Sequence, residues 1–247
     1  MGVAKVVDAD VEVEVDARAS REAGMSFVDR TPFVLLPGDE LLTSAMLSDS
    51  LDAVGLRHQV LDRRLAPLAP GSRAFGPAWT VRFEPTVDDD PIDPFGAAID
   101  YISAIRPGEV AVIGTDQSNA SAFWGELFSA AAVGAGAVGV VTDGNLRDSS
   151  KIVDLGFPAF SLSRRPIDYR ARMHVVETGA VVTLCGVVID TGDLVMADDD
   201  GVVIVPRSAE DHVLALARTR AASESTVLRE LLAGETLRSV WERHGVL

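Results

Sequence analysis

Three residues with side chains suited to enolate chemistry are placed at an informative spacing. Glu126 is followed, after a spacer of twenty residues, by Arg147 and Asp148. The spacer predicts a helix, a short buried strand at residues 137–141 and a turn with the sequence TDGNLRD. One helix, one strand and one turn can bring the Glu126 carboxylate back beside Arg147 and Asp148. One pocket would then hold a carboxylate for a hard metal ion, a second for its waters and a guanidinium for an anionic substrate.

Further motifs surround this triplet in a fixed order. The triplet lies within GEL and GAVGVVTDGNLRD, and the segments LSDSLDAVGL, GPAWTVRF and GDLVMADDDGVVIVP extend the pattern from about Leu35 to Pro206. These motifs resemble the RraA-like family, which includes the metal-dependent aldolases of 4-hydroxy-4-methyl-2-oxoglutarate (HMG) and 4-carboxy-4-hydroxy-2-oxoadipate (CHA). The resemblance implies an α/β fold, a β/β/α swivelling-type sandwich. It also implies a homo-oligomer, a trimer or hexamer, with active sites at subunit interfaces.

The resemblance gives each side chain of the triplet a role. Asp148 would be the direct ligand of Mg²⁺ or Mn²⁺, since one carboxylate with several waters and substrate oxygens is a coordination that Mg²⁺ favours. Glu126 would orient a metal-bound water or transfer a proton. Arg147 would pair with the oxygen of a 2-oxo acid and of its enolate, because guanidinium stays charged and donates in a fixed fork.

The backbone after Trp124 is expected to bind substrate as well. By the same resemblance, the amides of Leu127 and Phe128 would hold the C1 carboxylate, and a helix N-terminus suits such an anion. Gly125 would let the ligand approach the backbone closely.

Each residue of the triplet also has a purely structural interpretation. Asp148 could be a turn aspartate that caps backbone amides. Glu126 could be a solvated acid in the first turn of a helix, stabilised by the helix dipole. Arg147 could be a surface arginine paired with a nearby aspartate, such as Asp143.

The implied activity is a divalent-metal-dependent retro-aldol cleavage of a 4-hydroxy-2-oxo acid to pyruvate. Such an enzyme is a class II pyruvate aldolase, a carbon–carbon lyase, and oxaloacetate decarboxylation is an expected side activity because it passes through the same enolate. The only lysines are Lys5 and Lys151. Neither lies in the buried apolar context that Schiff-base chemistry needs.

A second function belongs to another class of protein. RraA-like proteins also include regulators that bind and inhibit an RNA-degrading endonuclease through protein contacts, without catalysis. A regulator has no need of a metal-binding acid after the arginine, and this chain has both Glu126 and Asp148. Their presence favours the enzyme.

Composition excludes several other classes. The net charge of −15 over 247 residues argues against nucleic-acid binding, which needs a basic stripe. No apolar run reaches the length of a membrane span, and no secretory signal core is evident, so a cytoplasmic location is expected. The single Cys185 cannot form an intramolecular disulfide and is expected as a buried, inert thiol in a strand. The four histidines are scattered along the chain without the spacing of metal ligands, which gives a zinc site little support.

One glycine motif is interpreted as structural. Gly134, Gly136 and Gly139 match the GxGxxG string of dinucleotide sites, but here a helix is expected before the glycines and a strand after them. The dinucleotide fold needs the reverse order, so tight helix-to-strand packing is the expected reason for these glycines.

The elements that must position the triplet form three expected regions: an acidic arm at residues 1–30, an RraA-like catalytic domain at 31–206 and a C-terminal helical extension at 207–247. Helices are predicted at residues 40–54 and 95–105, a loop between them at 84–94, and strands at 74–83, 109–114, 180–189, 194–197 and 202–205. In the extension, Ser208 and Asp211 resemble a capping box that opens a helix through Ala222, and two shorter helical segments with an apolar face follow around Gly234.

Overall fold

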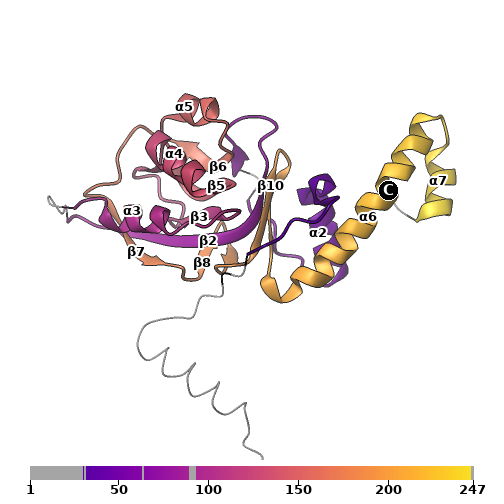
Figure 1. Cartoon of the computed structure of the whole chain (residues 1–247), viewed down its shortest axis with the longest axis horizontal. Helices are drawn as coiled ribbons and strands as arrows, with labels where there is room; N and C mark the ends of the chain where they lie inside the picture. Colours follow the sequence, from indigo (N-terminus) through magenta and orange to yellow (C-terminus); the bar gives the residue numbers. More distant parts are fainter. Residues whose placement is uncertain (1–29, 31, 63, 89–92, 246–247) are drawn as a thin grey trace, which may run out of the picture. The chain divides into compact units, whose positions relative to one another are not determined.

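A mixed sheet forms the centre of the protein. The computed structural model describes residue 30 and residues 32–62, 64–88 and 93–245, and we consider the unit Thr31–Leu247. In this part of the chain a nine-stranded sheet has the order β1-β6-β5-β3-β2-β10-β11, with β4 paired to β5 and β7 to β2 (Figure 1). The strands are β1 (Ala66–Pro67), β2 (Ala74–Pro85), β3 (Val110–Gly114), β4 (Ala122–Trp124), β5 (Gly139–Leu146), β6 (Ala159–Arg164), β7 (Met173–Thr178), β10 (Leu194–Asp198) and β11 (Gly201–Val205). The expected arm at residues 1–30 lies outside the described residues apart from Arg30.

Helices and a small hairpin complete the described elements. The hairpin consists of β8 (Val182–Leu184) and β9 (Val187–Ile189). The helices are η1 (Asp39–Leu41), α2 (Ser44–Ala53), α3 (Gly96–Ser103), α4 (Glu126–Ala135), α5 (Ser149–Asp154), η2 (Arg207–Ala209), α6 (Glu210–Leu232) and α7 (Leu237–His244). None of these helices combines the length and the apolar character that a membrane span requires.

The middle of the sheet is parallel. Strands β2, β3, β5 and β6 pair in parallel, so that Val112 lies between Thr80 and Val141. Every residue of β3 and of β5 is buried, which is typical of parallel strands covered on both faces. The α/β class predicted from the sequence is confirmed. All the carboxyl ends of these parallel strands point to one edge of the sheet, where β4 also ends.

Two apolar clusters stabilise the fold. In the first, the β8–β9 hairpin contributes Val182 and Ile189, which pack with the sheet residues Val110 and Val195. In the second, α2 and α6 cover β10 and β11. The start of α2 is fixed by Thr43, whose hydroxyl accepts a hydrogen bond from the Met46 amide at 3.2 Å.

The C-terminal extension differs from its expected form. A single helix, α6, runs from Glu210 to Leu232, where a helix ending at Ala222 had been predicted. The predicted capping box is wrong, because Ser208 lies in η2 and no side chain caps α6. The first half of α6 buries Val213 and Ala217 against α2, and α7 packs on its far end (Figure 1). Residues 222–232 contain no glycine or proline that would end the helix, and this part of α6 packs with α7.

Strand β5 is longer than predicted. The segment expected as a turn, TDGNL, continues the strand to Leu146, and only Arg147 and Asp148 lie beyond it. After an irregularity in the register, Asn145 pairs with Ser163 of β6 and with Ala122 of β4. Polar residues form strand here because their side chains have buried partners: Asn145 donates to the carbonyl of Ser121 at 2.8 Å.

The environment of Cys185 also corrects the prediction. Cys185 lies in the turn between β8 and β9, where its backbone has a positive φ of 50°, and the residue is only partly buried. The apolar run that predicted one strand at residues 180–189 is a tight hairpin, because Gly186 supplies the second left-handed residue.

The order of elements around the GxGxxG string is helix and then strand, as predicted, but the reason for the glycines differs among them. Gly136 ends α4 with a φ of 84°, in the left-handed region that favours glycine. Gly139 is required by packing, since an added Cβ would lie 2.6 Å from the Cβ of Ala74. Gly134 faces open space, so close packing does not explain it.

Candidate functional site

Two parallel strand ends bring the predicted triplet together. Strand β4 ends at Trp124 and β5 ends at Leu146, and these two residues are register partners. The Arg147 amide donates to the Trp124 carbonyl at 2.9 Å, which holds the two strand ends side by side. Glu126 begins α4 directly after β4, and Asp148 precedes α5 directly after β5. The chain therefore places an acid, a guanidinium and a second acid at one edge of the sheet.

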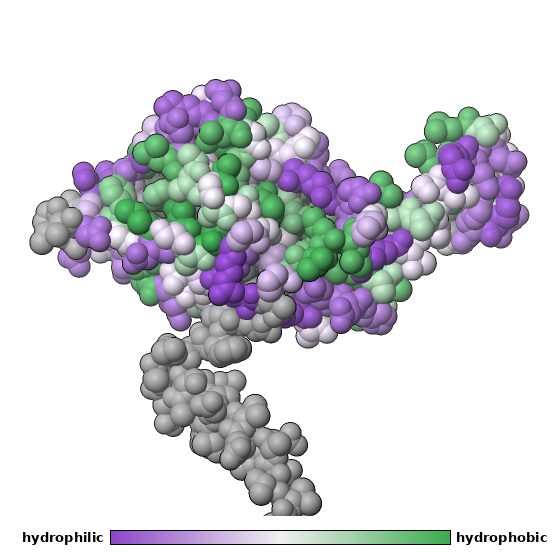
Figure 2. Space-filling model, viewed as in Figure 1, coloured by the Kyte–Doolittle hydropathy of each residue, from purple (hydrophilic) through white to green (hydrophobic). Residues whose placement is uncertain are grey.

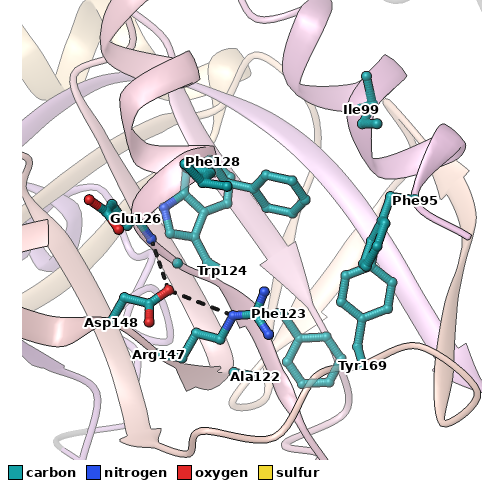
Figure 3. Close-up of a pocket in the computed structure, with 12 residues that line it drawn as sticks. Phe95, Ile99, Ala122, Phe123, Trp124, Glu126, Phe128, Arg147, Asp148 and Tyr169 are labelled. Atoms are coloured by element: carbon teal, nitrogen blue, oxygen red, sulfur yellow. Dashed lines mark hydrogen bonds and ion pairs between the residues drawn. The ribbon is translucent and has the colours of Figure 1, made fainter. Parts of the chain in front are cut away.

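Asp148 faces the N-terminus of α4. Its Oδ2 accepts a hydrogen bond from the Glu126 amide at 3.4 Å and lies 3.7 Å from Nε of Arg147 (Figure 3). Asp148 occupies the N-cap position of α5 with a left-handed φ of 55°, yet its side chain caps no amide of that helix. The structural interpretation expects Asp148 to cap backbone amides, and it accepts from the amide of Glu126 in α4 but from none of the following helix. A left-handed aspartate costs about 1 kcal/mol or more, and such strain is found at functional sites.

Gly125 is required at this point by contact with the other site residues. Its backbone is extended, with a φ of −158°. An added Cβ would lie 2.7 Å from Oδ2 of Asp148 and 3.0 Å from Cγ of Arg147. The absence of a side chain therefore sets the position of the Asp148 carboxylate against the start of α4.

Arg147 is oriented by a partner that the sequence did not indicate. Its Nη1 donates to Oδ2 of Asp168 at 2.8 Å. Burial alone would raise the pKa of Asp168, but hydrogen bonds from the Arg170 amide and from Arg147 outweigh it and hold that pKa below its usual value. Arg147 therefore does pair with an aspartate, but not with Asp143, whose buried carboxylate accepts from Thr115 and Gln117.

Glu126 also has a partner that sequence reasoning missed. Nζ of Lys151, in α5, lies 2.6 Å from its Oε2. The hydrogen bond to Glu126 raises the pKa of Lys151, so the lysine stays protonated. This is the opposite of what a Schiff-base lysine needs. One indication in the sequence that Lys151 lies near the site is that it follows Asp148 by three residues, which is about one turn of a helix.

A cavity of about 330 Å³ opens beside these charged groups. That volume is within the range of small-molecule sites. Its charged lining comes from the predicted Glu126, Arg147 and Asp148, and the predicted Gly125, Leu127 and Phe128 also line it. The rest of the lining was not predicted. Strand β4, directly before Gly125, contributes Ala122, Phe123 and Trp124, and distant segments contribute Phe95, Ile99 and Tyr169.

The donor set fits one kind of metal site. Among the described residues, no group of three or more His, Cys, Asp or Glu side chains could hold an ion. A closed structural site is therefore not formed by this part of the chain. Asp148 is 42% exposed, and within the described residues its Oδ1 accepts no hydrogen bond. A hard cation held by one carboxylate and otherwise by water and substrate oxygens fits this arrangement.

The chain is similar to several known proteins. DlpA of Legionella pneumophila is 27% identical over 199 residues, which cover 81% of this chain and 32% of DlpA, so the chain spans about a third of that relative. A candidate 4-hydroxy-4-methyl-2-oxoglutarate aldolase of Halalkalibacterium halodurans is 28% identical over 183 residues, 74% of this chain and 81% of the relative. The solved structure of Streptomyces coelicolor RraAS2, described as an unusual member of the RNase ES inhibitor RraA protein family, superposes with a TM-score of 0.70. Its sequence identity is 27%, and 81% of this chain and all of that chain are covered.

The structural match confirms the fold class that the resemblance implied, the β/β/α swivelling-type sandwich. Helices α6 and α7 form the C-terminal helical extension predicted from the sequence. The family includes both aldolase-named proteins and RraA inhibitors. Residues 44–204, more than half of the chain, match the family model described as Aldolase/RraA. This chain is therefore a member of the RraA-like family.

Proposed function

We propose that the protein is a metal-dependent pyruvate aldolase that cleaves a 4-hydroxy-2-oxo acid by a retro-aldol reaction. One observation carries the proposal: Glu126, Arg147 and Asp148 meet around one cavity at the N-terminus of α4. Relatives named as HMG aldolases support the reaction class.

Binding begins at α4 and at Arg147. The amides of Leu127 and Phe128, in the first turn of α4, bind the C1 carboxylate, because a helix N-terminus presents unpaired donors and a positive dipole end. Arg147 donates to the C2 carbonyl oxygen. Its pairing with Asp168 fixes the direction of the guanidinium before substrate arrives.

Cleavage needs a base and a stable enolate. Glu126, held by Lys151, accepts the proton of the C4 hydroxyl directly or through a water. The C3–C4 bond breaks, its electron pair forms the enolate of pyruvate, and Arg147 stabilises the negative oxygen. Uptake of a proton at C3 releases pyruvate. The chemistry that Mg²⁺ or Mn²⁺ supplies, when held by Asp148, is Lewis-acid polarisation of the 2-oxo group. Oxaloacetate decarboxylation is expected because it reaches the same enolate.

The second candidate is inhibition of an RNA-degrading endonuclease. It is favoured by the similarity to RraAS2. An inhibitor acts through surface contacts and has no use for an arginine oriented by Asp168 or for an acid turned toward a cavity. The built site therefore favours the enzyme.

The decisive experiment measures pyruvate release from a panel of 4-hydroxy-2-oxo acids, with Mg²⁺ and with excess chelator. Chelation should abolish the activity, and Mg²⁺ or Mn²⁺ should restore it. Asp148→Ala should lose activity by orders of magnitude, because the proposed ligand is gone. The control is Asp154→Ala, an exposed aspartate of the same helix outside the cavity, which should keep full activity. Full activity in excess chelator would refute the metal dependence.

A further inference from the structure

The cavity has two chemically different ends. Glu126 and Asp148 lie at one end, Phe95, Ile99 and Tyr169 lie at the other, and the guanidinium of Arg147 points into the space between them (Figure 3). Arg147 is the only cation among the described residues that line the cavity. In the proposed reaction, Arg147 already donates to the oxygen of the 2-oxo group. The far end therefore offers no described cation to a second acid group.

The far end is a braced aromatic wall. Tyr169 makes edge contacts with Phe95 and with Phe83, with ring centroids 5.5 Å and 5.3 Å apart, and Phe83 makes another with Phe123 at 5.2 Å. Rings that support one another in this way keep their positions without a ligand. Burial raises the pKa of Tyr169, so its hydroxyl stays neutral. The wall is therefore both preformed and uncharged.

The rim of the cavity continues this apolar character. Ile99 of α3 is 51% exposed and Leu127 of α4 is 79% exposed. Figure 2 shows apolar surface over these two helices, which contact each other. Unpaired carboxylates are costly to bury beside such side chains, whereas apolar groups gain from it.

A second recess, of about 230 Å³, shares Arg147 and Asp148 with the cavity and includes Arg164 and Arg165. It could in principle take a second carboxylate. However, Arg165 already donates to the Asn119 carbonyl, and the recess does not include the start of α4. A C1 carboxylate bound to the α4 amides lies in the aromatic cavity instead, and the free space beside it ends at the aromatic wall.

We propose that the preferred substrate carries an apolar or aromatic group, rather than a second carboxylate, on C4. This inference rests on the proposed retro-aldol function. The products are then pyruvate and an apolar aldehyde or ketone: the C3–C4 bond breaks, the C4 hydroxyl loses its proton to become a carbonyl, and C3 gains a proton. Phe95, Ile99 and Tyr169 contact the leaving group.

The test compares kcat/KM for 4-hydroxy-2-oxo-4-phenylbutanoate and for 4-hydroxy-2-oxoglutarate, which differ in the C4 group. The phenyl compound should be preferred about tenfold or more, the scale on which an apolar site discriminates. Ile99→Arg adds a cation to the wall and should lower this preference about tenfold. The matched control is Val133→Arg, which places the same charge at an apolar α4 residue of similar exposure, 48%, outside the cavity lining. The control should leave the preference unchanged.

A second measurement separates this inference from the function on which it rests. Exchange of the C3 protons of pyruvate in D₂O reports enolisation at the charged end alone. Exchange together with a preference for 4-hydroxy-2-oxoglutarate would overturn the apolar subsite and leave the aldolase proposal intact. The apolar subsite would also be overturned if Ile99→Arg left the preference for the phenyl compound unchanged. The same conclusion would follow if the protein preferred 4-hydroxy-2-oxoglutarate and Arg164→Ala abolished that preference. Absence of both exchange and cleavage would overturn the proposed function together with the inference.

Discussion

Gly125→Ala separates the geometry of the site from the stability of the fold. The added methyl group would lie 2.7 Å from Oδ2 of Asp148, about 0.7 Å inside ordinary van der Waals contact, which begins at 3.4 Å. The backbone at Gly125 is extended and accepts alanine without strain, and the nearest atom is the end of a side chain. The carboxylate of Asp148 should therefore yield, by at least about 0.7 Å, while the fold remains intact.

The expected cost is catalytic. A misplacement of about 1 Å can reduce a rate roughly 100-fold, so a shift of this size should lower kcat for pyruvate release by about 10- to 100-fold. The affinity for Mn²⁺, followed by titration, should fall as well, because the displaced carboxylate is the proposed ligand. The midpoint of thermal unfolding should change little.

Gly134→Ala is the matched control in the same helix. An added Cβ there meets nothing within 4 Å, so the site is unaffected. Alanine should stabilise α4 by about 0.5–1 kcal/mol, because glycine loses more backbone entropy in a helix. Unchanged kcat and Mn²⁺ affinity in Gly125→Ala would show that the position of Asp148 does not matter to the reaction.

Three other expectations concern charged groups. Arg147→Lys keeps the charge but loses the fork, so oxalate or pyruvate affinity, measured by calorimetry, should fall by about 1–3 kcal/mol; unchanged affinity would remove Arg147 from the substrate site. Glu126→Gln keeps size and hydrogen bonding, and steady-state kinetics should show a larger fall in kcat than rise in KM, since its proposed work is proton transfer. The hydrogen bond from Arg218 lowers the pKa of the buried Asp39, so their pairing stabilises the fold above the usual aspartate pKa and is lost as the pH falls through the lowered value. Urea unfolding should therefore give the wild type a larger free energy of unfolding than Asp39→Asn at pH 6, and this difference should shrink toward pH 3. A difference that does not change with pH would contradict the expectation.

Local sequence determined the elements nearest to the triplet. A helix and a strand separate Glu126 from Arg147, and each has a short-range signal: a run of small helix-forming residues and a run of valines. The turn expected at TDGNL was wrong, because this segment continues β5. The strands predicted at residues 194–197 and 202–205 pair as β10 and β11, and the Asp200–Gly201 sequence between them favours the tight turn that joins them. The residues that meet at the strand ends were therefore predictable as neighbours.

The tertiary structure alone decided how those residues are held and what surrounds them. Asp168 orients Arg147 from 21 residues away, and Phe95, Ile99 and Tyr169 reach the cavity from segments far from Glu126. Periodicity reports which face of an element is buried, but it carries no information about which other element covers that face. The same limit explains the strand at TDGNL, since buried hydrogen bonds outweighed the turn propensity of that segment. The sequence by itself therefore determined the charged end of the site, whereas the aromatic end exists only because the fold gathers distant rings around it.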